Sequence, residues 1–321
     1  MSPGEPAGGR TGARGGRRPG ERTNAYDDVC AECGGPVPAG TGLLRHGPTG
    51  WEVHHPEHAP APGPPPRGDH PGWHRRPLLS LDIGATGHRP AVDRIVSAAL
   101  RSSEGTAHDW RAEGGEGTES GEGEPGKGGS GDGGSGAGEP REGGSRTAEP
   151  REGALSPAVL DELAGLVTAQ LAAGELLVVW FAPYVLATLH AELLRHGLTP
   201  LTERLPAGVA PVCDPLVLDR HADRYRPGGR SLSAVADWYG VPLDHPGDPA
   251  ADAAAALALA QEIAARHPPL ARLSRPALHA EQLLWYADQM RRHPDAPDWP
   301  FTPVDPEPWE PPPHGPGSRP S

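Results

Sequence analysis

The sequence predicts an α/β domain in which a mixed sheet is flanked by helices. Apolar runs typical of strands come first, on both sides of a Thr-Gly turn at residues 86–87. Further along, apolar residues recur at helical spacing and alternate with short apolar runs. One of these, Leu176–Trp180, has the continuous pattern of a strand buried on both faces. Strands followed by alternating helices and strands favour a layered α/β arrangement.

The further elements have local signals at their ends. One helix begins at the N-cap and first-turn proline Ser156-Pro157 and ends at Gly174. A long alanine-rich helix, Ala250–His267, ends before two prolines. The remaining predicted elements are two strands that begin within Arg76–Leu100, strands over Ala107–Arg111 and Val209–Leu218, and helices over Pro183–His196, Ser233–Tyr239 and Arg275–Arg292.

Composition divides the 321 residues into parts that can and cannot fold. Gly (45) and Pro (42) far exceed average usage, and long stretches lack the apolar residues that offset ordering entropy. We expect a disordered basic arm over residues 1–24, a small Cys/His module over 25–60, a Pro-rich linker over 61–75, the α/β domain over 76–300 with a low-complexity insertion at about 111–153, and a disordered Pro-rich tail over 301–321.

Charge and cysteine content exclude some classes of function. The net charge of −13 argues against general affinity for nucleic acid, although much of the acid lies in the low-complexity stretch. No apolar run approaches the roughly 18 residues of a membrane span. No apolar h-region follows the arginine-rich N terminus, so we expect no signal peptide. The three cysteines do not suggest a disulfide framework, which favours a reduced, cytoplasmic protein.

The most informative motif lies at the first strand. An apolar run leads into Asp82, followed by Gly84 and a Thr-Gly turn, in the sequence LSLDIGATG. This pattern resembles the first motif, Asp-x-Glu-Thr-Thr-Gly, of the DEDDh family of 3'-5' exonucleases, with Gly84 at the glutamate position. That family includes the proofreading epsilon subunit of DNA polymerase III. The resemblance covers about residues 77–269 and implies a ribonuclease H-like exonuclease fold.

Two later segments extend this resemblance. The segment LVVWFAPYVLATLHAELLRHG resembles the second motif, with Phe181 at its asparagine position and Val185 at its aspartate position. The segment from Cys213 resembles the approach to the third motif in actinobacterial members. The sequence GDPAAD then puts Gly247 at the histidine position and Asp252 at the aspartate position.

The resemblance implies phosphodiester hydrolysis with two divalent ions. Four carboxylates hold the ions, and a histidine takes the proton from the attacking water. Of these five positions the chain keeps Asp82 and Asp252, whereas Gly84, Val185 and Gly247 replace the expected Glu, Asp and His. We therefore expect binding of Mg²⁺ or Mn²⁺ at the two remaining carboxylates to be weak or absent.

Two alternatives stay open at this site. A neighbouring side chain, His245 or Asp248, could compensate for the missing base or ligand. The sequence from Asp82 to Gly87 also resembles the first phosphate loop of sugar kinases and actin-like ATPases, but no second loop of that type follows.

The Cys/His module has the spacing of a zinc site. Cys30 and Cys33 form a Cys-x2-Cys knuckle, and a His-rich run follows about twenty residues later. This spacing suits a structural, tetrahedral Zn²⁺. We expect His55 and His58 as the other two ligands, with His54 as the substitute for His55. The alternative is a pair of exposed thiols beside a His-rich linker.

Candidate contacts to nucleic acid lie elsewhere on the domain. They are Thr86 in the first turn, and Arg224 and Arg226 in a basic cluster with Arg220 and Arg230. This cluster could follow a phosphate backbone, or it could be a solvated loop paired with local aspartates.

Three functions are compatible with these observations. The leading hypothesis is a nucleic-acid-associated protein of the 3'-5' exonuclease family with impaired catalysis, whose partners are single-stranded nucleic acid and a replication or repair protein. The first alternative is an active metal-dependent 3'-5' exonuclease with an altered site. The second is a non-enzymatic interaction scaffold that acts through the zinc module and the tails.

Overall fold

The computed structural model describes residues 22–47, 50–61, 63–112, 153–224, 226 and 228–307. Most residues of the three segments expected to be disordered lie outside this described part of the chain. The end of the first segment and the start of the last one lie within it. Asn24 is buried in the Cys/His module, where its side chain donates to the Val37 carbonyl, and Phe301 is buried in the α/β domain. The folded parts therefore extend slightly beyond the expected boundaries.

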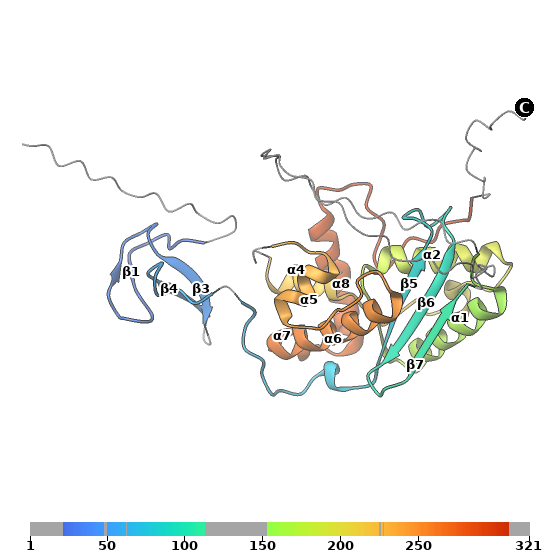
Figure 1. Ribbon diagram of the computed structural model, residues 1–321, viewed down its shortest axis with the longest axis horizontal. Helices are drawn as coiled ribbons and strands as arrows, with labels where there is room; N and C mark the ends of the chain where they lie inside the picture. Colours follow the sequence, from blue (N-terminus) through green and yellow to red (C-terminus); the bar gives the residue numbers. More distant parts are fainter. Residues whose placement is uncertain are drawn as a thin grey trace, which may run out of the picture.

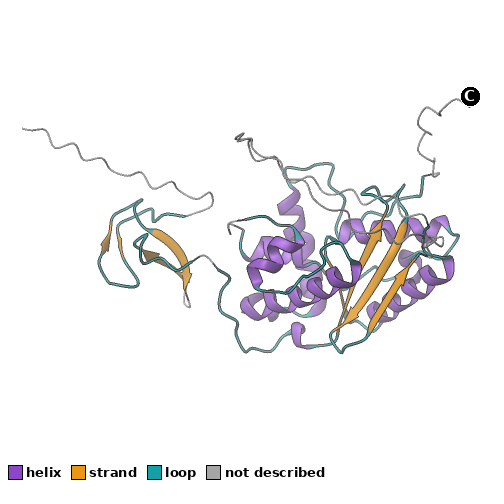
Figure 2. Cartoon of the chain, in the orientation of Figure 1, coloured by secondary structure: helices purple, strands orange, loops and turns teal. Residues whose placement is uncertain are grey.

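The α/β domain is built on a five-stranded mixed sheet (Figures 1 and 2). Its strands are β5 (Leu78–Ala85), β6 (Ile95–Ser102), β7 (Ala107–Arg111), β8 (Leu176–Val179) and β9 (Val212–Cys213). Their spatial order is β7-β6-β5-β8-β9, with β6 antiparallel to both of its neighbours and β8 and β9 parallel to β5. This order, with one antiparallel strand beside the first, is the ribonuclease H-like arrangement that the sequence resemblance implies.

Helices cover both faces of this sheet. Their bounds are α1 (Pro157–Ala172), α2 (Ala182–Arg195), α3 (Leu201–Arg204), α4 (Pro215–Ala222), α5 (Leu232–Tyr239), α6 (Pro249–Arg266), α7 (Pro268–Ala271) and α8 (Arg275–Met290), after a short 3-10 helix, η1 (Trp73–Arg75). Within the described residues, no helix is both long enough and apolar enough to cross a membrane.

Strand alternation decides which face each residue of β5 joins. Leu81 and Ile83 belong to the core that α1 and α2 share, whereas Leu78 belongs to the core that α4, α5 and α6 share. Asp82 and Gly84 have the parity of Leu78, so they face α6. The first sequence motif and the start of α6 are thereby placed against each other.

One predicted strand is much shorter than expected and is followed directly by a helix. Val209–Leu218 was expected to be extended, but β9 covers only Val212–Cys213 and α4 begins at Pro215. The reason is local, because Asp214 caps the helix by accepting a hydrogen bond from Leu216 N, and proline occupies the first helical position.

The Cys/His module contains two small hairpins. Strand β1 (Asp28–Val29) pairs with β2 (Pro36–Val37), and β3 (Leu43–Gly47) pairs with β4 (Gly50–His54). Its buried apolar cluster consists of Cys30, Val37 and Val53, with Leu44 packed against it. Figure 1 shows this module set apart from the α/β domain.

The segment that follows the module lies along α6. Gly68 N donates to the Ala265 carbonyl at 2.8 Å, and Arg266 Nη1 donates to the Pro65 carbonyl at 2.7 Å. A Cβ on Gly72 would overlap the Ala271 carbonyl oxygen, so glycine permits this close approach. The Pro-rich segment is thus attached to the C-terminal half of the same helix whose first turn faces Asp82.

Candidate functional site

Three carboxylates gather where β5 faces the start of α6. Asp82 lies on β5, Asp248 is the N-cap residue of α6, and Asp252 lies in its first turn. Gly247 N donates to Asp252 Oδ2 at 3.0 Å, and Arg111 Nη2 donates to Asp248 Oδ1 at 2.5 Å. We refer to Asp82, Asp248 and Asp252 as the carboxylate site.

The carboxylate site is short of positive charge. Burial raises the pKa of Asp82 well above its ordinary value, and the charges of Asp252 and Asp248 raise it further. Burial also raises the pKa of Asp252 to about 6, although the Gly247 hydrogen bond opposes the rise. Asp252 Oδ1 is buried with no hydrogen-bond partner among the described residues. Such a site favours a proton or a cation.

The raised pKa of Asp252 predicts a pH-dependent cost in stability. Because the native pKa is about 6 and the ordinary value is 3.8, the folded state holds extra proton between these pH values, and stability falls as the pH rises through them. Asp252→Asn removes this cost. We expect its Tm to rise by about 2 °C at neutral pH and the gain to vanish near pH 4.

Thermal unfolding across this pH range measures the effect. Asp244→Asn is the charge-matched control, because it removes the same charge from an exposed side chain that is not part of the carboxylate site. An equal gain for both variants, or a gain that grows toward acid pH, would contradict the assignment.

The three replaced positions are fitted to their present residues. A Cβ on Gly84 would overlap Ser97 Oγ on β6 and lie 3.4 Å from Pro249 Cγ. Val185 is 3% exposed and belongs to the apolar core under α2. Gly247 has a φ of +89°, in the region that favours glycine. A glutamate at position 84 would require Ser97 Oγ to move, an aspartate at position 185 would lie in an apolar core, and a histidine at position 247 would have a strained backbone.

An aromatic pair borders the carboxylate site. Phe181, the N-cap residue of α2, stacks on Tyr184 with ring centroids 6.2 Å apart, and it is 43% exposed. Tyr184 donates to the Gly87 carbonyl at 2.5 Å. Its pKa is raised to about 12, mainly by burial and then by the nearby charges of Asp93 and Asp82. The two rings therefore lie near the end of β5.

The backbone of Phe181 is strained. Its φ of 55° is left-handed, and it is the one non-glycine residue of this kind in the described part of the chain. The buried carboxylate of Asp214 holds it there by accepting from Phe181 N at 3.2 Å and Ala182 N at 2.9 Å. Strain that the surroundings maintain, at an exposed aromatic side chain, is typical of a functional position.

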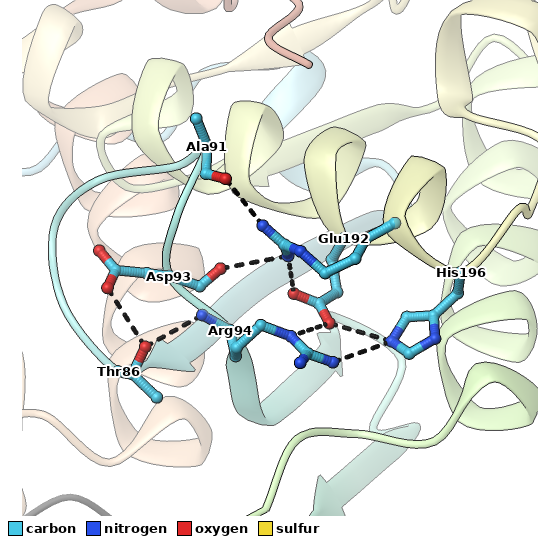
Figure 3. A network of polar contacts seen from close by, with 7 residues as sticks. Thr86, Ala91, Asp93, Arg94, Glu192 and His196 are labelled. Carbon is cyan, nitrogen blue, oxygen red and sulfur yellow. Dashed lines mark hydrogen bonds and ion pairs between the residues drawn. The ribbon is translucent and has the colours of Figure 1, made fainter. Parts of the chain in front are cut away.

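A polar network attaches the turn after β5 to α2 (Figure 3). The buried carboxylate of Glu192 accepts from Arg94 Nε at 2.8 Å and from Arg195 Nη1 at 2.6 Å, and His196 Nε2 lies 3.2 Å from it. Arg195 also donates to the Ala91 carbonyl at 2.8 Å. The turn that carries Thr86 is therefore held in one position.

The four zinc-candidate side chains lie together in the Cys/His module. Cys30 Sγ lies 3.6 Å from His58 Nδ1, and Cys33 Sγ lies 3.4 Å from His55 Nδ1. A sulfur and a nitrogen bound tetrahedrally to one zinc, at about 2.3 and 2.0 Å, are about 3.5 Å apart. All four donor atoms lie within 4.8 Å of one another. The cluster has the dimensions of a zinc site.

Surrounding contacts orient this cluster. His55 Nε2 lies 3.2 Å from the Pro36 carbonyl, which leaves Nδ1 to face the sulfurs. Burial raises the pKa of the Cys30 thiol, but hydrogen bonds from Cys33, His55 and His58 outweigh it and lower the pKa to about 5. The neighbouring His54 lies outside the cluster, buried 3.6 Å from Glu52. His55 is the histidine that the structure brings to the cysteines.

The donor atoms of the carboxylate site are less closely grouped than those of the cysteine cluster. Over the described ranges, the Cys30 cluster is the one group of three or more His, Cys, Asp or Glu side chains whose donor atoms come within 4.8 Å of one another. The carboxylate oxygens of Asp82, Asp248 and Asp252 do not all come within 4.8 Å of one another.

The other candidate residues have varied surroundings. Thr86 Oγ1 is engaged within its turn, where it accepts from Arg94 N at 3.0 Å. Arg224 is exposed, and its Nη1 lies 3.7 Å from Asp288. Arg226 is buried, with its guanidinium bound to Asp219 at 2.9 Å, so it is not placed to contact a phosphate. His245 is exposed beside the start of α6.

Solved structures of exonuclease I resemble the chain in part. One, concerned with how processivity is achieved, has a TM-score of 0.43 at 15% identity and covers 68% of this chain and 44% of its own. E. coli exonuclease I with a dT13 oligonucleotide gives 0.42 at 18% identity, covering 60% and 42%. The complex with dA16 gives 0.42 at 17% identity, with the same coverage.

The chain thus spans less than half the length of these exonuclease structures. No protein-family model and no curated protein matches the sequence. The assignment of the fold rests on the strand order of the sheet, and the chemistry rests on the residues of this chain.

Proposed function

We propose that this protein binds the ends of single-stranded nucleic acid on an exonuclease-like fold and hydrolyses them slowly or not at all. The observation that carries the proposal is the fit of the three replaced positions to their surroundings. The sequence resemblance places a ligand or a base at each of them. Here a serine hydroxyl, an apolar core and a left-handed glycine take up the space or the conformation that those residues need.

The remaining carboxylates support weak metal binding at most. Mg²⁺ needs near-octahedral oxygen ligands, and a two-ion site needs several carboxylates. Asp82 and Asp252 are two such ligands, and the third member of the carboxylate site, Asp248, is already paired with Arg111. In this proposal Mg²⁺ or Mn²⁺ at Asp82 and Asp252 offsets their mutual repulsion and contacts a terminal phosphate without activating water efficiently.

The aromatic pair supplies an attachment for a base. Stacking on an exposed aromatic ring tolerates any sequence and contributes about 1–3 kcal/mol per base. Phe181→Gly removes the ring and replaces it with glycine, which adopts the φ of 55° at this position without strain. We expect the affinity for a labelled single-stranded oligonucleotide to fall about 10-fold, with Tm unchanged or raised.

Fluorescence anisotropy titration measures this loss. The control is Tyr26→Ala, because Tyr26 is an exposed aromatic residue of the Cys/His module, far along the chain from α2. Equal affinity of Phe181→Gly and the unsubstituted chain would remove the aromatic pair from the proposal. A loss shared with Tyr26→Ala would show that the effect is not local.

We also propose that Cys30, Cys33, His55 and His58 bind one structural Zn²⁺. The two sulfur–nitrogen distances of 3.4 and 3.6 Å support this assignment. The ion would hold the two hairpins together, and the module would be available for contact with a replication or repair protein. That partner, and the cytoplasmic location that the cysteine content favours, stay predictions.

A further inference from the structure

A concave site lies between the C-terminal ends of α4 and α8. Its cavity of about 840 Å³ is lined by Arg220, Arg224 and Arg230 on one side and by Trp285, Arg291 and Arg292 on the other. We refer to it as the arginine pocket. It shares no residue with the carboxylate site, and its volume is that of a site for a nucleotide-sized ligand.

The arginine pocket concentrates positive charge in an acidic chain. Five arginines line it, against one carboxylate, Asp288, in a protein of net charge −13. Asp288 is already engaged by Arg291 and, at 3.7 Å, by Arg224. Within the described part of the chain, neither Arg220 nor Arg292 makes an ion pair. The pocket therefore keeps a net positive charge after its internal pairs are counted.

The walls of the pocket are held by buried contacts. The fully buried carboxylate of Asp219 accepts from both Arg226 and Arg230, which fixes Arg230 at the rim. His221 stacks on Trp285 with ring centroids 3.8 Å apart and 14° between the ring planes. These contacts join α4 to α8 and shape the cavity before any ligand binds.

Helix dipoles account for part of this arrangement. Arginines near helix C termini are stabilised by the dipole, and both α4 and α8 end here. That effect explains Arg220 and Arg291 on their own helices. It does not explain why two helix ends and Arg230, from a separate segment, surround one cavity.

The chemistry of the lining favours phosphate over an acidic peptide. Guanidinium groups bind phosphate oxygens in a bidentate manner, and several of them together suit a chain of phosphates. A peptide would need an apolar anchor, but Trp285 has His221 stacked on it and Met290 is the other large apolar residue of the lining. We propose that the arginine pocket binds successive phosphates of single-stranded nucleic acid, away from the carboxylate site. This inference rests on the proposed nucleic-acid binding.

The test removes charge from the pocket without touching its buried walls. Arg291→Gln combined with Arg292→Gln changes two exposed side chains. If each contacts one phosphate, the affinity for a labelled oligothymidylate should fall about 25-fold at about 0.1 M salt, and the slope of log K against log salt should decrease by about 1.4. Anisotropy titrations over a range of salt concentrations give both quantities.

Matched variants separate this inference from the proposed function. Arg76→Gln with Arg272→Gln removes the same charge from exposed positions outside the pocket, and should change affinity far less. If Phe181→Gly weakens binding but the Arg291/Arg292 pair does not, the pocket inference is overturned and the proposed function stands. If oligothymidylate does not bind the unsubstituted chain at all, both fail. The inference is also overturned if an acidic peptide binds the unsubstituted chain, and the Arg291/Arg292 substitutions abolish that binding but leave oligothymidylate binding unchanged.

Discussion

Removal of zinc is expected to unfold the Cys/His module and to leave the α/β domain folded. The module has three buried apolar side chains, Cys30, Val37 and Val53, and two short hairpins, which is too little apolar burial to stabilise it alone. A structural zinc contributes about 10–16 kcal/mol in small domains of this type. We expect one zinc per chain by elemental analysis. On chelation, amide protection should be lost over residues 22–60 alone.

Adjacent histidines provide the matched control for zinc binding. His55→Gln should lose the zinc and the amide protection, whereas His54→Gln should keep the zinc, because His54 lies outside the cluster. Hydrogen exchange on the full chain follows both the module and the α/β domain in one experiment. A metal-free chain whose module is as protected as before would overturn the zinc assignment.

The unsubstituted chain is expected to leave a 5'-labelled single-stranded oligonucleotide intact in Mg²⁺ and in Mn²⁺. Loss of a general base alone costs about 10²–10⁴-fold in rate, and two of the carboxylate ligands implied by the resemblance are missing as well. Gel analysis of the labelled strand shows the result. Products shortened stepwise from the 3' end that disappear in Asp82→Ala would instead establish an active exonuclease with an altered site.

Introducing the motif residues that the sequence resemblance implies should raise hydrolysis most when their surroundings are changed as well. Gly84→Glu is combined with Ser97→Gly, because a Cβ at position 84 would overlap Ser97 Oγ, which would otherwise have to move. With Val185→Asp and Gly247→His added, we expect at least about a 100-fold increase over the unsubstituted chain. The matched variant that keeps Ser97 should gain much less.

The cost of this restoration in stability is itself informative. Val185→Asp puts a carboxylate into an apolar core, and Gly247→His puts a side chain at φ +89°. The Tm of each variant must therefore be measured beside its activity. A stably folded variant with all four substitutions and no added hydrolysis would show that substrate binding at this site has been lost as well.

Some of these features could be predicted because they depend on local sequence. The mixed sheet follows from apolar runs and the helix spacing, and the cysteine cluster follows from Cys-x2-Cys with histidines at a suitable distance. The sequence favours His55 as the ligand but keeps its neighbour His54 as a substitute, because spacing alone does not exclude either. Both are close enough along the chain, and only the register of β4 decides which of them faces the cysteines.

Other features depend on contacts between distant segments. Ser97 was not a candidate, because its proximity to Gly84 comes from the pairing of β5 with β6. The arginines after α8 also join those after α4 only through tertiary packing. Spacing along the chain identifies such residues only when a motif connects them.

The attachment of the Pro-rich segment to α6 limits how far the Cys/His module can move. The module ends where Arg45 Nε donates to the Pro60 carbonyl, and the attached part begins where Arg266 holds the Pro65 carbonyl. Five residue steps separate these two points, a reach of about 17 Å at full extension. A tether this short sets a local concentration in the millimolar range. A ligand that contacts both the module and the domain would therefore gain avidity that neither surface provides alone.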